Sequence, residues 1–120
     1  MAFVALLTAD LMQSSQVAGA AQRAAAQLRV FSSADALCAA LAEAPSAEEA
    51  ARLVIVDLAA PGLDVRSLLS QLDALPMGKP PTLAFGPHVH TERLNAAREA
   101  GCDQVISRGQ FQAQMDMLLS

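Results

Sequence analysis

The stretch that decides the fold runs from Leu53 to Asp64 and reads Leu-Val-Ile-Val-Asp-Leu-Ala-Ala-Pro-Gly-Leu-Asp. Four apolar residues lead without interruption into Asp57, and a Pro-Gly pair then supplies the chemistry of a turn. A continuous apolar run of this kind predicts a strand over 53–58 that is covered on both faces, as in a parallel sheet. Asp57 is therefore expected near the carboxyl end of a buried strand, where open α/β sheets bind ligands. A carboxylate there needs a partner, because its desolvation is costly.

Length, composition and charge exclude several classes of protein. The 120 residues suffice for one domain with a core, and we expect 1–120 to form a single domain. The chain is 53% hydrophobic, yet no apolar run approaches the roughly 18 residues of a membrane span. A net charge of −4 argues against a nucleic-acid partner, which needs a cationic surface. Two cysteines and no secretion signal favour reduced thiols and a cytoplasmic location without a membrane partner.

Apolar runs and helix-period segments alternate along the rest of the chain. Ser33 and Thr91 are candidate caps of two helices, Pro45 is expected to end the second helix, and a short helical turn is predicted over 46–49. The alternation predicts a doubly wound, five-stranded parallel sheet with helices on both faces, a three-layer α/β/α architecture. The predicted strands are 3–8, 28–31, 53–58, 82–85 and 104–106, and the predicted helices are 11–27, 34–44, 65–75, 91–100 and 111–119.

Three of these segments together resemble a known family. Asp57 is followed by a Pro-Gly turn, residues 97–106 resemble an Ala-Gly-Ala-Asp-x-Tyr-Leu segment, and residues 29–37 resemble a second strand and helix. In this order and spacing they resemble the CheY-like receiver domain of bacterial response regulators over nearly the whole chain. The resemblance implies a flavodoxin-like (βα)5 fold, a phosphoacceptor at Asp57, and a place in two-component phosphorelay signalling.

The machinery that the resemblance implies around Asp57 is incomplete. Receivers carry two adjacent acids after the first strand, and the corresponding pair here is Ala9-Asp10. Asp10 and Asp57 would then form a weakened Mg²⁺ site, since Mg²⁺ prefers several oxygen ligands in octahedral geometry.

Two further positions depart from the family pattern. Gly86 stands where receivers have a Thr or Ser, and Arg108 stands where they have a Lys. Arginine keeps the charge but not the chemistry of lysine. Ser107 supplies a hydroxyl if the register is shifted by one residue, and Val105 replaces the usual aromatic residue.

These departures indicate a degenerate receiver, or pseudo-receiver, in which efficient phosphorylation is doubtful because phosphoryl transfer depends on positioning and charge neutralisation. Two interpretations of Asp57 stay open. It is either a site of phosphoryl chemistry, or a strand-end carboxylate that pairs with Arg108 or caps a turn.

Both histidines of the chain, His88 and His90, lie two residues apart in the loop after the fourth predicted strand. Imidazole and carboxylate suit Zn²⁺ or Mn²⁺, so the histidines, Asp10 and Asp57 are a candidate metal set. The alternative is that one histidine packs on the loop and the other is solvated.

The leading hypothesis is a stand-alone receiver-type signalling module without an output domain, which is not an enzyme and acts by protein–protein contact. By resemblance, its partner is a histidine kinase or another signalling protein that binds the face formed by 91–100, 104–106 and 111–119, where a homodimer would also form. The alternatives are a working Asp57 phosphoacceptor and a small metal-dependent enzyme that uses the candidate metal set. A Rossmann-type nucleotide site is disfavoured, because residues 8–11 contain no glycine.

Overall fold

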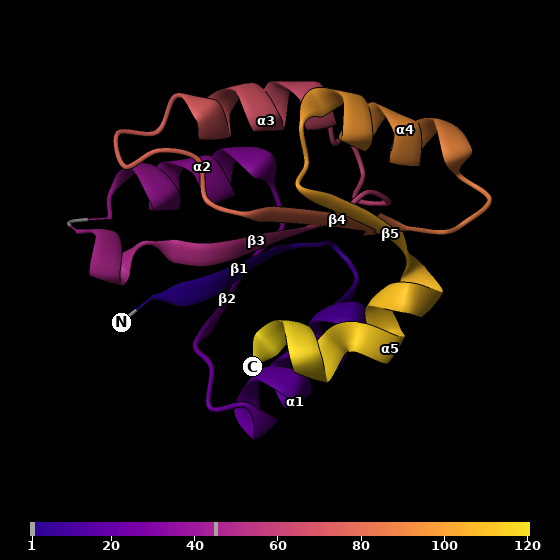
Figure 1. Ribbon diagram of the computed structural model, residues 1–120, viewed down its shortest axis with the longest axis horizontal. Helices are drawn as coiled ribbons and strands as arrows, with labels where there is room; N and C mark the ends of the chain where they lie inside the picture. The colour runs from indigo at the N-terminus through magenta and orange to yellow at the C-terminus, as the bar shows by residue number, and fades with distance from the viewer. Residues whose placement is uncertain (1, 45) are drawn as a thin grey trace.

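A five-stranded parallel sheet forms the centre of the computed structural model, which describes residues 2–44 and 46–120 (Figure 1). The strands lie in the order β2-β1-β3-β4-β5, and all four pairings between neighbours are parallel. The predicted flavodoxin-like, doubly wound sheet is confirmed. The strands are β1 (Phe3–Leu7), β2 (Leu28–Phe31), β3 (Ala51–Asp57), β4 (Thr82–Gly86) and β5 (Gln104–Ser107).

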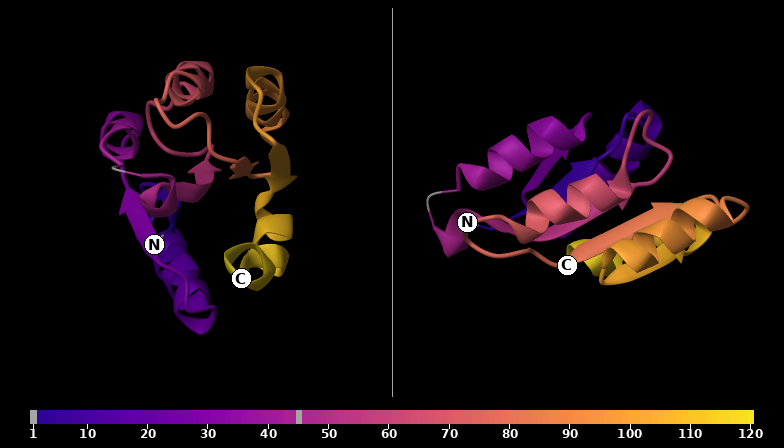
Figure 2. Two further views of the ribbon diagram at one scale, coloured as in Figure 1. Left: turned by 60° about the vertical axis from the view of Figure 1, so that its left-hand side comes forward. Right: turned by 90° about the horizontal axis from the view of Figure 1, so that it is seen from above.

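Helices cover both faces of this sheet and complete the three predicted layers (Figures 1 and 2). Two helices, α1 (Leu11–Arg23) and α5 (Arg108–Leu119), lie on one face. The other face carries α2 (Ala34–Ala42), α3 (Val65–Asp73) and α4 (Thr91–Ala100). The short helical turn predicted before β3 is present as the 3₁₀ helix η1 (Ala47–Glu49).

Two apolar clusters, one on each face, bury β1 and β4 completely and most of β3. All five residues of β1 are buried, and successive side chains enter opposite clusters, as the two-residue period of a strand requires. Val4 and Leu6 pack toward α1 and α5, where the rings of Phe85 and Phe111 stack with their centroids 4.1 Å apart. The continuous apolar runs in the sequence are therefore explained by burial on both faces.

Helix ends are where the sequence prediction was least accurate. The first helix ends at Arg23, because Ala24 caps it and Ala25 then adopts a left-handed φ of 55°. The second and third helices each end two residues before the predicted ends at 44 and 75, at caps formed by Glu43 and Ala74. Pro45, which was expected to end the second helix, lies outside the described residues.

Predicted caps were confirmed at Ser33 and contradicted at Thr91. The Ser33 side chain accepts a hydrogen bond from the backbone N–H of Ala36. The N-cap position of helix α4 is His90, whose side chain makes no capping hydrogen bond. Thr91 is the first helical residue, so the prediction that Thr91 caps this helix was wrong. The helix ends as predicted at Gly101, whose φ of 103° suits glycine.

No helix in the described part of the chain is long and apolar enough to cross a membrane. Cys38 and Cys102 both carry free thiols, and burial raises the pKa of each.

Candidate functional site

Asp57 is the last residue of β3, at the carboxyl edge of the sheet, and only 2% of its surface is exposed. It is paired in register with Phe85 of β4, and the N–H of the next residue, Leu58, donates to the Phe85 carbonyl at 2.9 Å. The sequence prediction for Asp57 is therefore confirmed in position and burial. Its carboxylate must be satisfied by protein groups, because so little of it reaches solvent.

Two neutral donors hold the two oxygens of this carboxylate. The Thr8 hydroxyl donates to Oδ2 at 2.7 Å, and the backbone N–H of Ala59 donates to Oδ1 at 2.9 Å. Thr8 is itself 3% exposed, and its oxygen accepts a hydrogen bond from the backbone N–H of Asp10 at 3.1 Å. The Ala59 bond closes a turn, so Asp57 makes the contact that the turn-capping interpretation predicts.

Thr8 is the functional residue that sequence analysis missed. The predicted acidic neighbour was Asp10, but the structure places its carboxylate at the start of α1, where Oδ1 accepts from the N–H groups of Met12 and Gln13. Asp10 is exposed, and no hydrogen bond joins it to Asp57 in the described residues. The overlooked signal was a lone polar residue that directly follows an apolar strand.

Gly86 ends β4 beside this site and is buried. A Cβ atom added there would stand 3.4 Å from Leu58 Cβ and 3.8 Å from Leu94 Cδ2. A Cβ atom at this position would therefore make ordinary van der Waals contacts with two leucines. The position itself offers no hydroxyl.

Ser107 has a structural role at the start of α5, of which Arg108 is the first residue. Ser107 caps the helix: its hydroxyl accepts from the Gln110 N–H, and the Gln110 side chain accepts from the Ser107 N–H. The helix consequently starts at Arg108, three residues earlier than predicted. The ion pairs in the described part of the chain are Arg23–Asp116 and Arg66–Glu99, so the hypothesis that Asp57 pairs with Arg108 was wrong.

His88 and His90 are both exposed in the loop between β4 and α4. Within residues 2–44 and 46–120, no three His, Cys, Asp or Glu side chains come together in a way that could hold a metal ion. The four-residue metal set of Asp10, Asp57, His88 and His90 is therefore not assembled, and that hypothesis was wrong.

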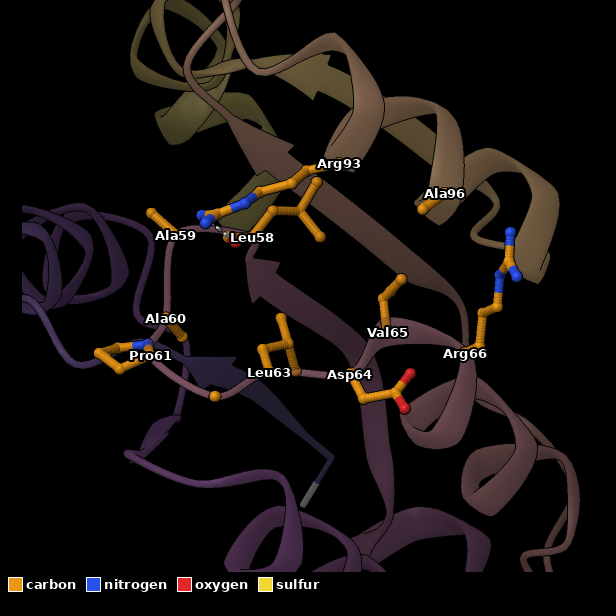
Figure 3. A pocket seen from close by; sticks show the side chains of 11 residues that line it. Leu58, Ala59, Ala60, Pro61, Leu63, Asp64, Val65, Arg66, Arg93 and Ala96 are labelled. Carbon is orange, nitrogen blue, oxygen red and sulfur yellow. Dashed lines mark hydrogen bonds between the residues drawn. The ribbon is translucent and has the colours of Figure 1, made fainter.

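A cavity of about 380 Å³ is lined by the loop that follows Asp57 (Figure 3). The loop over 58–64 forms one wall and α4 forms the other through Arg93 and Ala96. The Arg93 guanidinium extends across the cavity and donates to the Leu58 carbonyl at 3.3 Å (Figure 3). This cavity, which we call the loop–α4 groove, was not predicted from the sequence.

No protein-family model and no curated protein matches the chain, whereas many solved structures share its fold. The receiver domain of NtrX from Brucella abortus matches with a TM-score of 0.75 at 20% identity, covering 96% of this chain and 92% of that one. The chain has the fold of a receiver domain.

Two further structures with the receiver fold extend the comparison. The receiver domain of the sensor histidine kinase PA1611 from Pseudomonas aeruginosa, with a magnesium ion coordinated in its active-site cleft, matches with a TM-score of 0.80 at 12% identity, covering 98% of this chain and 93% of that one. A longer NtrX chain from Brucella abortus matches with a TM-score of 0.76 at 21% identity over 98% of this chain. The present chain spans 26% of that longer protein.

Proposed function

We propose that this chain is a receiver-type signalling module that acts mainly by protein–protein contact, and that phosphoryl transfer to Asp57 is impaired. One observation carries the proposal. Both oxygens of the Asp57 carboxylate are held by neutral donors of the chain, at 2.7 and 2.9 Å, and the residue is 2% exposed. An acceptor that must attack a phosphoryl donor needs an approachable oxygen and nearby positive charge.

The residues around Asp57 fit Mg²⁺ poorly. The resemblance assigned a weak Mg²⁺ site to Asp10 and Asp57. Asp10 Oδ1 accepts two backbone N–H groups at the start of α1, and the neighbour that contacts Asp57 is a hydroxyl rather than a carboxylate. Mg²⁺ is usually bound through one or two carboxylates, with several waters completing an octahedral shell.

The partner surface proposed for this module is the face of α4, β5 and α5, by analogy with receivers. A single apolar side chain supports this placement: Met117 of α5 is 67% exposed, whereas Met115 is buried. The proposed partner is a histidine kinase or another cytoplasmic signalling protein, and a homodimer is the alternative occupant.

The second candidate function is a working phosphoacceptor in a phosphorelay. It is favoured by one observation, the location of Asp57 at the carboxyl end of the central strand β3. The two functions differ in whether a phosphoryl analogue binds at Asp57.

The deciding experiment is a titration with beryllofluoride and millimolar Mg²⁺, followed by amide NMR shifts near Asp57, Gly86 and Arg108. We expect no saturable shift in the natural chain. The matched positive variant is Thr8→Asp, which places a second carboxylate beside Asp57 and is expected to gain Mg²⁺-dependent shifts. Saturable shifts in the natural chain that vanish in Asp57→Asn would overturn the proposal and favour the phosphoacceptor.

A further inference from the structure

We propose that Arg93 of α4 controls access to the Asp57 carboxylate, because it holds the peptide group that follows Leu58. The inference rests on the proposed function in one respect, the assignment of α4 to the partner face. It deepens that function by naming how contact at α4 regulates the buried aspartate. It is carried by hydrogen bonds on both sides of one peptide group and by the packing around it (Figure 3).

The peptide group that joins Leu58 to Ala59 is held from two sides. Its N–H, which belongs to Ala59, donates to Asp57 Oδ1 at 2.9 Å. Its carbonyl, which belongs to Leu58, accepts from Arg93 Nη1 at 3.3 Å, and Figure 3 shows the guanidinium reaching this carbonyl from α4. A trans peptide group is planar, with its N–H and C=O pointing in opposite directions. The group therefore cannot turn without changing both hydrogen bonds.

The rest of Leu58 is anchored to β4 and α4. Its N–H donates to the Phe85 carbonyl at 2.9 Å, and the residue is 5% exposed. Its side chain packs in the same apolar cluster as Leu94, and both lie within 4 Å of the point where Gly86 would carry a Cβ atom. The N–H and the side chain of Leu58 are thus fixed by packing, whereas the orientation of its carbonyl depends on Arg93.

Arg93 provides the weaker and more accessible of the two contacts. Its bond of 3.3 Å is longer than the typical N–H···O distance of about 2.9–3.0 Å, and the residue is exposed, so water competes for its donors. The bonds to Asp57 are shorter, at 2.7 and 2.9 Å, and are made by a residue that is 2% exposed. Release of the peptide group therefore starts at Arg93.

Loss of the Arg93 bond acts directly on the cover of Asp57. The Ala59 N–H is one of the two donors that hold its carboxylate, and the Thr8 hydroxyl is the other. When contact at α4 draws the guanidinium away, the peptide group is free to turn, and the Ala59 N–H leaves Oδ1. One carboxylate oxygen then becomes approachable. Arg93 is thus a positioning residue, which acts on Asp57 through the peptide group between them.

Two readouts on the full chain test this inference. Amide hydrogen exchange at Ala59, followed by NMR, measures how often its N–H leaves Asp57. Labelling with a water-soluble carbodiimide and glycine ethyl ester, mapped by mass spectrometry, measures access to the Asp57 carboxylate. The exposed carboxylate of Asp64 in the same loop serves as the internal reference for labelling.

Arg93→Met removes the donor and keeps a long side chain. We expect amide exchange at Ala59 and relative labelling of Asp57 each to rise roughly fivefold, the equivalent of one modest hydrogen bond. Arg93→Lys keeps a charged donor and should return both rates toward those of the natural chain. The matched control is Arg98→Met, which removes an equal charge from α4 at an exposed residue bonded to Asn95 and should change neither rate.

A double substitution distinguishes one shared peptide group from two independent contacts. In Asp57→Ala the Ala59 N–H has lost its acceptor, so adding Arg93→Met should raise exchange at Ala59 by less than about twofold. Asp57→Asn keeps an acceptor at Oδ1, and in this background Arg93→Met should keep most of its effect. Independent contacts would instead give the same rise in every background.

Three results would overturn the inference: unchanged rates in Arg93→Met, equal rises in Arg93→Met and Arg98→Met, or additive effects in the double substitution. None of these measurements needs a partner or a phosphoryl analogue, so they are independent of the beryllofluoride titration. The expected rate changes together with beryllofluoride binding by the natural chain would refute only the impaired phosphorylation. Unchanged rates together with no beryllofluoride binding would refute only the control of Asp57 by Arg93.

Discussion

The same residue pair, a buried threonine bonded to an aspartate, occurs at both edges of the sheet. At the carboxyl edge the Thr8 hydroxyl donates to Asp57 at 2.7 Å. At the amino edge Asp103 Oδ2 accepts from the Thr82 N–H at 2.8 Å and from the Thr82 hydroxyl at 3.2 Å, and the Asp103 N–H donates to that hydroxyl at 3.0 Å. Both threonines are almost fully buried.

The two aspartates differ in burial. Asp57 is 2% exposed, whereas Asp103 is an exposed residue just before β5. The amino-edge pair joins β4 to the loop that precedes β5, far from the edge at which α/β proteins bind ligands, and its role is structural. The comparison teaches that the hydrogen bonds to a threonine are a sufficient reason for an aspartate to occur at the end of a strand. Its presence at position 57 does not by itself indicate phosphoryl chemistry.

Asp57→Ala is expected to have the largest effect. It leaves the Thr8 hydroxyl and the Ala59 N–H without their acceptor, and unpaired buried donors cost about 1–3 kcal/mol each. Urea unfolding should show a loss of about 3 kcal/mol. Asp103→Ala, at the exposed edge, should lose clearly less. A rise in stability for Asp57→Ala would break the comparison, because it would mean that the carboxylate is repelled rather than held.

Gly86→Thr is expected to destabilise the chain by about 2 kcal/mol, the usual cost of overpacking a core. The added Cβ lies 3.4 Å from Leu58 Cβ and 3.8 Å from Leu94 Cδ2, and the hydroxyl and methyl group of threonine must then be placed in a buried site. Thermal or urea unfolding measures the loss. Gly19→Ala is the control, since its Cβ meets only the end of the flexible Arg23 side chain at 3.5 Å, and alanine in a helix is favoured by roughly 0.5–1 kcal/mol. Unchanged stability in Gly86→Thr would show that this end of the sheet has room for a hydroxyl switch.

The pH dependence of stability tests the amino-edge pair. The Thr82 N–H bond holds the pKa of Asp103 below its ordinary value of 3.8. The pKa of Asp103 is lower in the folded chain than in the unfolded chain, so its ionised carboxylate stabilises the fold. This stabilisation is complete above pH 3.8 and is lost as the pH falls through the folded-state pKa.

We expect this contribution to stay below about 1 kcal/mol, since Asp103 is exposed to solvent. In urea unfolding at a series of pH values, the natural chain should lose stability below pH 3.8 more steeply than Asp103→Asn. If the stability of the two proteins falls with pH in the same way, the hydrogen bond between Thr82 and Asp103 contributes nothing to stability.

Thr8→Ser and Thr82→Ser should each have a small effect. Each keeps the hydroxyl and its hydrogen bonds and removes one buried methyl group, which costs about 1 kcal/mol. Calorimetry should show losses of similar size. A much larger loss in Thr8→Ser would indicate that the methyl group of Thr8 also fixes the direction of its hydroxyl toward Asp57.

The sequence predicted most of the fold because its strongest signals are local. Continuous apolar runs identified β1, β3 and β4, and alternation with helix-period segments indicated the parallel sheet. Helix ends were less accurate because they depend on backbone conformations such as the left-handed φ of Ala25, for which alanine gives no signal. The capping box of Ser107 and Gln110 was visible in the sequence and was given too little weight.

The candidate site was predicted only in part because its contacts are long-range. Position and burial of Asp57 followed from the apolar run before it. Its bond to Thr8 joins residues 49 positions apart and was not visible in the sequence. The contact between Leu58 and the Gly86 position and the hydrogen bond from Arg93 to the Leu58 carbonyl were likewise not visible in the sequence. Both depend on how β3, β4 and α4 pack.

The bonds around Thr8 connect the two helical layers of the molecule. The backbone N–H of Asp10, at the start of α1, donates to Thr8, Thr8 donates to Asp57, and Asp57 accepts from Ala59 in the loop that faces α4. Helix α1 and the loop–α4 groove lie on opposite faces of the sheet, so three hydrogen bonds in series span its edge. The two faces of the sheet are thus joined by hydrogen bonds between the chain's own groups, without any covalent modification.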